Sequence, residues 1–230
     1  MKFKNLAIIT AGLLIVFQFI PAVFAAAADE YRKKAEQGDK LAQYNLGLCY
    51  ERGWGAAKNP AEAAKWYRSA AEQGLAQAQY NLGCCYAIGF GVTKNLTEAV
   101  SWYRKAAEQD LAQAQQNLGI CYANGYGVTR DLTEAVKWYR KAAEQGHAAG
   151  QFNLGFCYYN GYGLTKDLPE AVKWWQKAAE QGHAEAQNNL GFCYYNSIGV
   201  TEDRTEAVKW WQKAAAQGNK DAKAALAQLN

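Results

Sequence analysis

The sequence predicts an all-α protein: a right-handed α/α superhelical solenoid of five 36-residue two-helix repeats with half-repeat caps. The first observation behind this prediction is the triplet Asn-Leu-Gly, which recurs every 36 residues without insertion, at Asn45, Asn81, Asn117, Asn153 and Asn189. The second is a tryptophan with the same period, at Trp66, Trp102, Trp138, Trp174 and Trp210. A fixed period of this size indicates units that bury their apolar faces against their neighbours.

The second helix of each unit is marked by an apolar stripe and by both of its ends. Its buried face carries Ala135, Trp138, Tyr139, Ala142 and Ala143, at i, i+3, i+4, i+7 and i+8. A capping box, with Glu three residues after an N-cap acceptor, predicts the helix start at Asn59, Asn95, Asp131, Asp167 and Asp203. A left-handed glycine predicts the helix end at Gly74, Gly146, Gly182 and Gly218, with Asp110 as the exception.

A Gly-x-Gly turn, such as Gly125-Tyr126-Gly127, joins the two predicted helices of a unit. No strand precedes this turn and no Lys-Ser/Thr follows it at the required spacing. We therefore interpret it as a helix connection and not as a phosphate-binding loop.

The first 25 residues have the organisation of a secretory signal. Lys2 and Lys4 precede an apolar run over residues 6–20, and small residues follow before a cleavage point at Ala26. The run is about 15 residues long, shorter than the roughly 20 needed to span a bilayer. We predict export to the periplasm or the medium, with no stable membrane insertion after cleavage.

The predicted organisation places half units at both ends of the array, because residues 31–38 match the end of a second helix and residues 221–229 match the start of a first helix. The predicted segments are a signal peptide at 1–25, a cap at 26–38, repeats at 39–74, 75–110, 111–146, 147–182 and 183–218, and a capping helix at 219–230.

The charge balance does not indicate a nucleic-acid partner. The chain has 25 Lys and Arg against 21 Asp and Glu, a net charge of +4, and the basic residues are spread out. Loss of Lys2 and Lys4 with the leader lowers that charge further.

In the unit at 111–146 the repeat has the form Ala-x-x-Leu-Gly-x-x-Tyr-x-x-Gly-x-Gly-Val-x-x-Asp-x-x-x-Ala-x-x-Trp-Tyr-x-Lys-Ala-Ala-Glu-Gln-Gly. This pattern closely resembles the Sel-one-like repeat, a relative of the tetratricopeptide repeat, over residues 29–229. The resemblance implies an α/α superhelix that scaffolds protein complexes, often in bacterial envelope or host-interaction settings, and it does not imply an enzyme.

One exported branch of that family, the cysteine-rich proteins of Helicobacter, carries a Cys pair in each repeat. The matching positions here are Ala143 and Gln151, or Ala179 and Gln187, so those disulfides are absent. Because that branch is described as penicillin-binding or β-lactamase-like, an envelope hydrolase or a peptidoglycan- or β-lactam-interacting protein is the alternative function. The sequence has no Ser-x-x-Lys, Ser-Asp-Asn or Lys-Thr-Gly motif, and we predict no catalytic residue.

Five of the six cysteines occupy one repeat position, at Cys49, Cys85, Cys121, Cys157 and Cys193. Stacked repeats separate equivalent positions by roughly 8–10 Å, beyond the reach of a disulfide, so we interpret these residues as small buried hydrophobes. Cys84 lies outside this row, and an accessible, redox-active thiol is the alternative interpretation for it.

No metal or cofactor site is predicted. His147 and His183 each begin a first helix without convergent ligands, and we interpret both as solvated loop residues. Glu134 and its equivalents are explained by the capping boxes. Asn95-Leu96-Thr97 has the pattern of a glycosylation site, but Asn95 is also an expected N-cap.

The asparagine of each Asn-Leu-Gly triplet has two interpretations. In related peptide-binding repeats, asparagines on first helices hydrogen-bond the backbone of an extended peptide. The other interpretation, which we favour, is a structural hydrogen bond between helices or to a loop, repeated because the fold repeats.

Alignment with the tetratricopeptide groove places four first-helix positions on the concave face of the predicted superhelix. In the C-terminal half these positions, which we call the aromatic patch, are Phe152, Phe156, Tyr159, Asn160, Phe192, Tyr195 and Asn196. Large apolar anchors beside amides suit a peptide or a partner helix, and packing of these rings between repeats is the alternative. Trp175 and Trp211 replace the usual Tyr and suggest a second patch on the second helices.

The sequence as a whole predicts a non-catalytic scaffold or adaptor exported from a bacterium. We expect it to bind a protein or a peptide on its concave face.

Overall fold

The computed structural model describes residues 25–229, which are helices joined by short turns and contain no strand. A helix over residues 25–36 comes first. The first helices of the five repeats are α2 (Lys40–Arg52), α4 (Ala76–Ile88), α6 (Ala112–Asn124), α8 (Ala148–Asn160) and α10 (Ala184–Asn196). The second helices are α3 (Pro60–Glu72), α5 (Leu96–Ala107), α7 (Leu132–Glu144), α9 (Leu168–Glu180) and α11 (Arg204–Ala216), and α12 (Lys220–Ala227) follows them.

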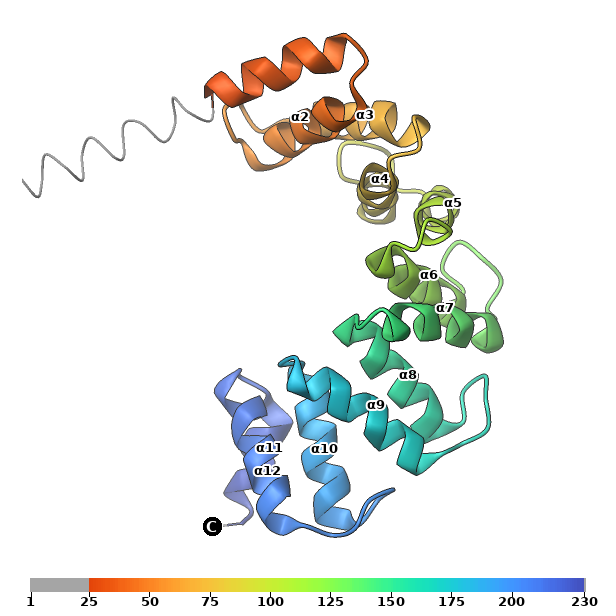
Figure 1. The fold of residues 1–230 in the computed structure, drawn as a ribbon, viewed down its shortest axis with the longest axis vertical. Helices are drawn as coiled ribbons and strands as arrows, with labels where there is room; N and C mark the ends of the chain where they lie inside the picture. The colour runs from red at the N-terminus through yellow and green to blue at the C-terminus, as the bar shows by residue number, and fades with distance from the viewer. Residues whose placement is uncertain (1–24, 230) are drawn as a thin grey trace, which may run out of the picture. The chain divides into compact units, whose positions relative to one another are not determined.

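The helices belong to two compact units, of which the first ends at Lys105 and the second begins at Ala106. In the first unit α3 packs against both α2 and α4 (Figure 1). In the second unit each helix from α6 to α12 packs against the next helix in the chain. Consecutive pairing of helices confirms the predicted α/α solenoid of two-helix repeats.

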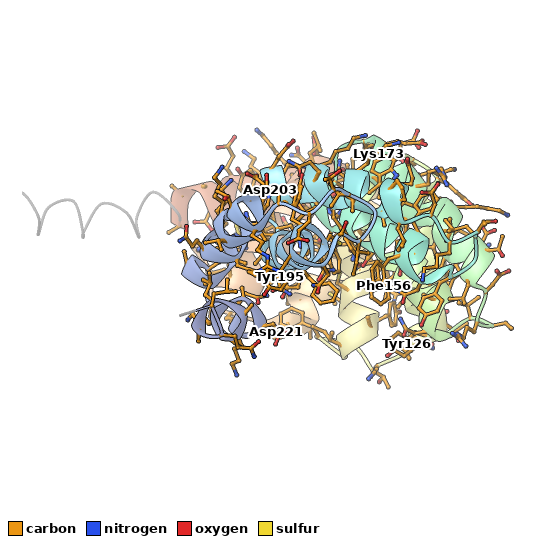
Figure 2. All side chains as sticks on the ribbon, turned by 90° about the horizontal axis from the view of Figure 1, so that it is seen from below. Tyr126, Phe156, Lys173, Tyr195, Asp203 and Asp221 are labelled. Atoms are coloured by element: carbon orange, nitrogen blue, oxygen red, sulfur yellow. The ribbon has the colours of Figure 1, made fainter. Side chains whose placement is uncertain are left out.

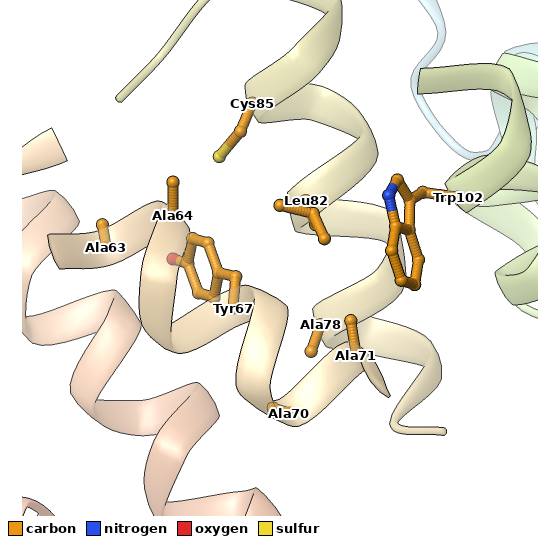
Figure 3. Packing of buried hydrophobic residues seen from close by; sticks show 9 residues of the cluster. All are labelled: Ala63, Ala64, Tyr67, Ala70, Ala71, Ala78, Leu82, Cys85 and Trp102. Atoms are coloured by element: carbon orange, nitrogen blue, oxygen red, sulfur yellow. The ribbon is translucent and has the colours of Figure 1, made fainter. Parts of the chain in front are cut away.

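Each repeat has a core of one leucine, several alanines and one large ring. Leu46, Leu82, Leu118, Leu154 and Leu190, the leucines of the Asn-Leu-Gly triplets, are fully buried. In the first unit Leu82 and Tyr67 lie between α3 and α4, and Ala70 and Ala78 allow those helices to approach closely (Figure 3). Because alanine has a short side chain and a high helix propensity, the predicted stripe serves helix formation and helix packing together.

The glycine of each Asn-Leu-Gly triplet makes room for that ring. A Cβ atom at Gly47 would lie 2.7 Å from the ring of Tyr67, and one at Gly155 would lie 2.6 Å from the indole of Trp175. Contacts this short do not occur with a side chain, so the glycine is required by the close approach of the second helix.

Four of the five tryptophans of the row are buried and are covered by lysines one turn later. Trp102, Trp138, Trp174 and Trp210 are each at most 9% exposed. The Lys177 Nζ lies 4.1 Å from the ring centroid of Trp174, and the Lys213 Nζ lies 3.9 Å from that of Trp210. These contacts place a cation over an indole face, and the lysine methylenes shield the apolar ring from water.

The predicted N-caps of the second helices are confirmed. Asp131 Oδ1 accepts from the backbone N of Glu134 at 2.9 Å, and Asn95 Oδ1 accepts from Thr97 N and Glu98 N at 3.1 Å. Asn95 is therefore the helix cap that the sequence predicts.

The other half of the predicted capping box is replaced by different bonds. The backbone N of Asp131 donates to the Tyr122 carbonyl at 2.9 Å, so it does not need the Glu134 side chain. The Glu134 carboxylate instead accepts from Lys137 Nζ at 2.8 Å. The loop thus docks on the first helix through its backbone, and the glutamate is left to make an exposed ion pair.

His147 and His183 are N-caps of α8 and α10, which corrects their interpretation as solvated loop residues. The Nδ1 atom of His147 accepts from Gly150 N at 3.2 Å, and that of His183 accepts from Ala186 N at 3.3 Å. Burial lowers the pKa of both imidazoles, and the neighbouring His183 lowers the pKa of His147 further. Both effects favour the neutral ring, which has the free acceptor that a cap needs.

A row of buried glutamines with the same period was missed by the sequence analysis: Gln43, Gln79, Gln115, Gln151 and Gln187. Gln151 Nε2 donates to the Ala143 carbonyl at the end of α7, at 3.2 Å. Its Oε1 accepts from Gln181 Nε2 at the end of α9, at 2.8 Å. One side chain therefore links three helices, and its 36-residue spacing was the signal that could have revealed it.

The predicted signal peptide lies outside the described residues, except for Ala25. Within the described part, no helix combines the length and the apolar character that crossing a membrane requires.

Candidate functional site

The aromatic patch is built on α8 and α10 of the second unit, and its two exposed rings are Phe156 and Phe192. Phe156 is 43% exposed and Phe192 is 46% exposed. Both line a cavity of about 210 Å³ with Tyr159, Trp175 and Asn189. Phe156 and Tyr195 lie on one side of this unit, and Lys173 lies on the opposite side (Figure 2). Packed helices therefore hold two apolar side chains at the mouth of one cavity.

The other rings of the patch are half-buried and pack on neighbouring helices. Phe152 stacks on the His183 imidazole with 4.6 Å between ring centroids. Tyr159 lies against Trp175, and Tyr195 lies against Trp211, at 5.3 and 5.4 Å. The structure thus divides the predicted patch into exposed rings and rings that also hold the repeats together.

The two asparagines of the patch bond to their own helices. Asn160 Nδ2 donates to the Phe156 carbonyl and Asn196 Nδ2 donates to the Phe192 carbonyl, both at 2.9 Å. Each bond runs back along its own helix to the residue four positions earlier. The Oδ1 atoms remain as acceptors that an approaching backbone N–H could use.

Phe156 also borders a larger cavity on its N-terminal side, with a volume of about 410 Å³. Its ring meets that of Tyr162 edge-on at 5.9 Å, and Asn153 and Ile120 line the same cavity. Arg130 is the one charged residue of this lining, and its Nε donates to the Ala123 carbonyl at 3.0 Å. Phe156 is therefore shared by two adjacent cavities of the second unit.

Trp175 and Trp211 do not form the suggested second patch. They are 2% and 4% exposed, and their Nε1 atoms donate to the carbonyls of Phe152 and Asn188 at 3.1 and 3.2 Å. Each indole is larger than the tyrosine of the other repeats and reaches the backbone of the first helix. The substitution changes packing inside the repeat and does not create a surface.

A cavity of about 370 Å³ lies in the first unit, between α2 and α4. Asn81 lines it beside Tyr44 and Tyr67, and its side chain acts against the burial that raises the pKa of both phenols. This member of the asparagine row therefore lies between helices, beside tyrosines of α2 and α3. Asn153 and Asn189 line the cavities of the second unit, where they border the aromatic patch.

All six cysteines are free, and the five of the repeat row are buried as predicted. Burial raises the pKa of Cys121 and Cys157 to about 11 and that of Cys85 and Cys193 to about 12. Cys84 is half-buried in the cavity of the first unit, where it accepts from the Tyr103 hydroxyl at 3.4 Å, and burial raises its pKa too. A thiol that stays protonated at neutral pH is a poor nucleophile, so this environment does not favour redox chemistry at Cys84.

Among residues 25–229, no group of three or more His, Cys, Asp or Glu side chains is arranged to hold a metal ion. Both histidines are engaged as helix caps. The chemistry that the aromatic patch offers is apolar contact and hydrogen bonding.

The Sel1 repeat family matches five consecutive segments of the chain, residues 40–75, 76–111, 112–147, 148–183 and 184–219. These segments begin one residue later than the repeats defined above. A comparison with curated proteins gives no match.

Two solved structures share substantial sequence with the chain. The first is a protective antigen of uropathogenic Escherichia coli strains that displays an SLR fold, with 42% identity and a TM-score of 0.84 over 88% of this chain. The present chain spans 43% of that protein's length. The second is a Sel1 repeat protein from Oxalobacter formigenes, with 38% identity and a TM-score of 0.78, covering 86% of this chain and 84% of that one.

An immunity protein from Pseudomonas aeruginosa has the same fold at 24% identity, with a TM-score of 0.53 over 80% of this chain and 66% of that one.

Sel1-like repeat proteins are a family of binding and adaptor proteins. The repeat matches cover residues 40–219, with helix pairs throughout. The chain therefore belongs to the Sel1 repeat family.

Proposed function

We propose that this protein is a non-catalytic adaptor that binds a protein or a peptide through the aromatic patch of its second unit. The observation that carries the proposal is the pair Phe156 and Phe192, which stand exposed at one cavity of about 210 Å³. Exposed large apolar side chains grouped at a concavity are typical of interaction sites. The half-buried rings behind them would hold the pair in place and reduce the entropy lost on binding.

The chemistry of this surface favours a partner with apolar side chains and free backbone groups. Phe156 and Phe192 offer apolar contact, and Asn153 and Asn189 offer amides at the cavities between first helices. A segment that inserts one apolar side chain beside Phe192 would bury both rings from water.

We further propose that the protein is exported from a bacterium and acts in the periplasm or outside the cell. The leader pattern of residues 1–25 supports this, with Lys2 and Lys4 ahead of an apolar run. Mass spectrometry of the protein from its native host tests it: a chain beginning at Ala26 is expected in the envelope fraction or the medium. A full-length chain in the cytosol would contradict export.

The binding site is tested by crosslinking from a photoreactive amino acid placed at position 156, in the native host. The captured partner is then purified, and its affinity is measured for the unmodified protein and for Phe156→Ala/Phe192→Ala. Loss of two exposed anchors is expected to weaken binding by about 2 kcal/mol or more, roughly thirtyfold. Both residues are exposed, so the double variant should keep the circular dichroism and melting temperature of the fold.

Leu41→Ala is the matched control, because Leu41 is 57% exposed on α2 of the first unit and lies outside the patch. Equal affinities of the folded double variant and the control would overturn the site. Turnover of a chromogenic β-lactam by the purified protein would contradict the non-catalytic part of the proposal.

A further inference from the structure

The cavity of about 370 Å³ in the first unit differs in chemistry from the cavities of the second unit, because a carboxylate lines it. Glu51, near the end of α2, shares this lining with the rings of Tyr44 and Phe90 and with the aliphatic side chains of Leu48 and Ile88. In the other repeats the equivalent positions of Glu51 are occupied by uncharged residues, Ala87, Ala123, Tyr159 and Tyr195. The cavity of the first unit therefore has its own binding properties.

A hydrogen bond from a buried tyrosine holds the Glu51 carboxylate in place. Its Oε2 accepts from the hydroxyl of Tyr67, which is fully buried in α3. Asn81 of α4 lies beside this hydroxyl and that of Tyr44, in the lining of the same cavity. The Tyr67–Glu51 bond links α3 to α2, so the carboxylate is oriented before any ligand arrives.

Glu51 forms no ion pair within the described part of the chain. Arg52 also lines the cavity, but it is exposed and its guanidinium lies over the Trp54 ring, 4.6 Å from the centroid. A half-buried carboxylate loses hydration that a protein cation would replace. Aromatic walls favour a cation as well, because ring faces carry negative charge.

We propose that this cavity binds the basic side chain, lysine or arginine, of a protein partner. Its cation would meet the Glu51 carboxylate, and its methylenes would lie along Leu48, Ile88 and the rings of Tyr44 and Phe90. That the cation belongs to a protein rests on the proposed function, whereas the preference of the cavity for a cation does not. The protein would then bind a positively charged side chain in its first unit and apolar side chains in its second.

The test is a two-dimensional NMR titration of the protein with Nα-acetyl-lysine amide at millimolar concentrations. The backbone amide of Glu51 and the side-chain amide of Asn81 are expected to shift in a saturable way. The Nε-acetylated form of the probe, which has no charge, should leave both signals in place. Glu51→Gln keeps an acceptor for Tyr67 and should weaken binding about tenfold or more, because a charge-assisted bond becomes neutral.

Two further variants test whether the effect depends on charge at the cavity itself. Glu72→Gln removes an exposed carboxylate of the same unit and should change nothing, which controls for general charge effects. Arg52→Gln removes a positive charge from the lining of the cavity and should tighten binding of the charged probe. Equal shifts with the uncharged probe, no shift with the charged probe, or unchanged affinity of Glu51→Gln would each overturn the cation site. Stronger binding of putrescine than of the lysine amide would overturn the assignment to a protein side chain.

The outcome of the NMR titration does not depend on whether the aromatic patch binds a partner. Failure of the Phe156→Ala/Phe192→Ala experiment would overturn the proposed function and leave the titration result as it is.

Discussion

The buried glutamines show how much a single side chain contributes to this fold. Gln115 is completely buried, and its amide donates to the Ala107 carbonyl at 3.1 Å while its Oε1 accepts from Gln145 at 2.7 Å. Carbonyls at a helix end lack partners within the helix, and an apolar side chain here would leave one of them buried and unpaired. The glutamine row therefore satisfies polar groups at every junction where it occurs.

Gln151→Met should destabilise the protein, because it keeps the side-chain volume but removes the bonds to Ala143 and Gln181. The expected loss is about 1–3 kcal/mol in the free energy of unfolding. Urea denaturation followed by circular dichroism measures it. Gln113→Met, at an exposed position of α6, is the control and should stay within about 0.5 kcal/mol of the unsubstituted protein. Similar midpoints for the two variants would show that the buried bonds contribute little.

Two glycines in turns have the same left-handed backbone conformation but different surroundings. Gly163 has φ of 70°, and a Cβ atom there would lie 2.2 Å from the Leu132 carbonyl oxygen at the start of α7. Gly182 has φ of 90° and nothing within 4 Å of its Cβ position. The two glycines share the left-handed conformation, and only Gly163 faces a neighbouring backbone.

Gly163→Ala should therefore cost more than Gly182→Ala. Both substitutions incur roughly 1–2 kcal/mol for the left-handed backbone, and Gly163→Ala adds about 1–3 kcal/mol of overpacking. Thermal unfolding of both variants measures the difference. If Gly182→Ala melted at or below the temperature of Gly163→Ala, the contact with α7 would not be the reason for this glycine.

At the scale of helices, the N-cap of the first helix differs from repeat to repeat. The N-cap position holds Asp39, Leu75, Leu111, His147 and His183. The aspartate and the histidines accept from the helix backbone, and the two leucines make no side-chain cap bond. Only the histidine caps of α8 and α10 depend on protonation near neutral pH.

Acidification should therefore destabilise the second unit. Burial places the folded-state pKa of His147 and His183 below their ordinary value of about 6.5. Their contribution to stability is complete above that value and is lost as the pH falls through the folded-state pKa, because the unfolded chain binds more protons. The protonated rings also lose the Nδ1 acceptor and place positive charge at a helix N-terminus.

The comparison is between the protein and His147→Asn/His183→Asn, with melting temperatures measured from pH 7.5 to about pH 5. Asparagine caps a helix without titrating, so the double variant should lose less stability on acidification. Parallel curves for the two proteins would contradict a role for the histidine caps.

At the scale of the whole molecule, the stability of the repeat array depends on the helix that covers its last repeat. α12 packs against α11, and its Ala222 joins Ala207, Trp211 and Ala214 in one buried cluster. Without α12, the apolar face of α11 would meet water, as the terminal face of any repeat array does when its cap is removed.

A chain that stops after Gly218 should therefore be less stable than one that stops after Ala227, which keeps α12. Exposing Trp211 and its neighbours should cost about 1.5–3 kcal/mol. It should also shift tryptophan fluorescence to longer wavelength. Chemical denaturation of both truncated chains tests this, and identical unfolding curves would show that α12 does not protect the array.

Much of the fold was predictable because most of the local patterns that mark helices and turns recur in all five repeats. The 36-residue period, the N-caps of the second helices and the burial of Cys49 and its equivalents were all correctly predicted. His147 and His183 were misinterpreted because two copies of a cap are hard to distinguish from loop residues. Trp175 was misinterpreted because sequence does not show that its indole N–H reaches the Phe152 carbonyl.

By itself the sequence determined the repeat, its helices and its family, because periodic apolar spacing and capping residues act locally and recur. Only the tertiary structure decided which members of a row share an environment. It left Phe156 and Phe192 exposed, turned Tyr159 and Tyr195 toward tryptophans, and brought Glu51, Tyr67 and Asn81 together from three helices. Exposure and side-chain contact depend on neighbours from other helices, which a single position within a repeat does not specify.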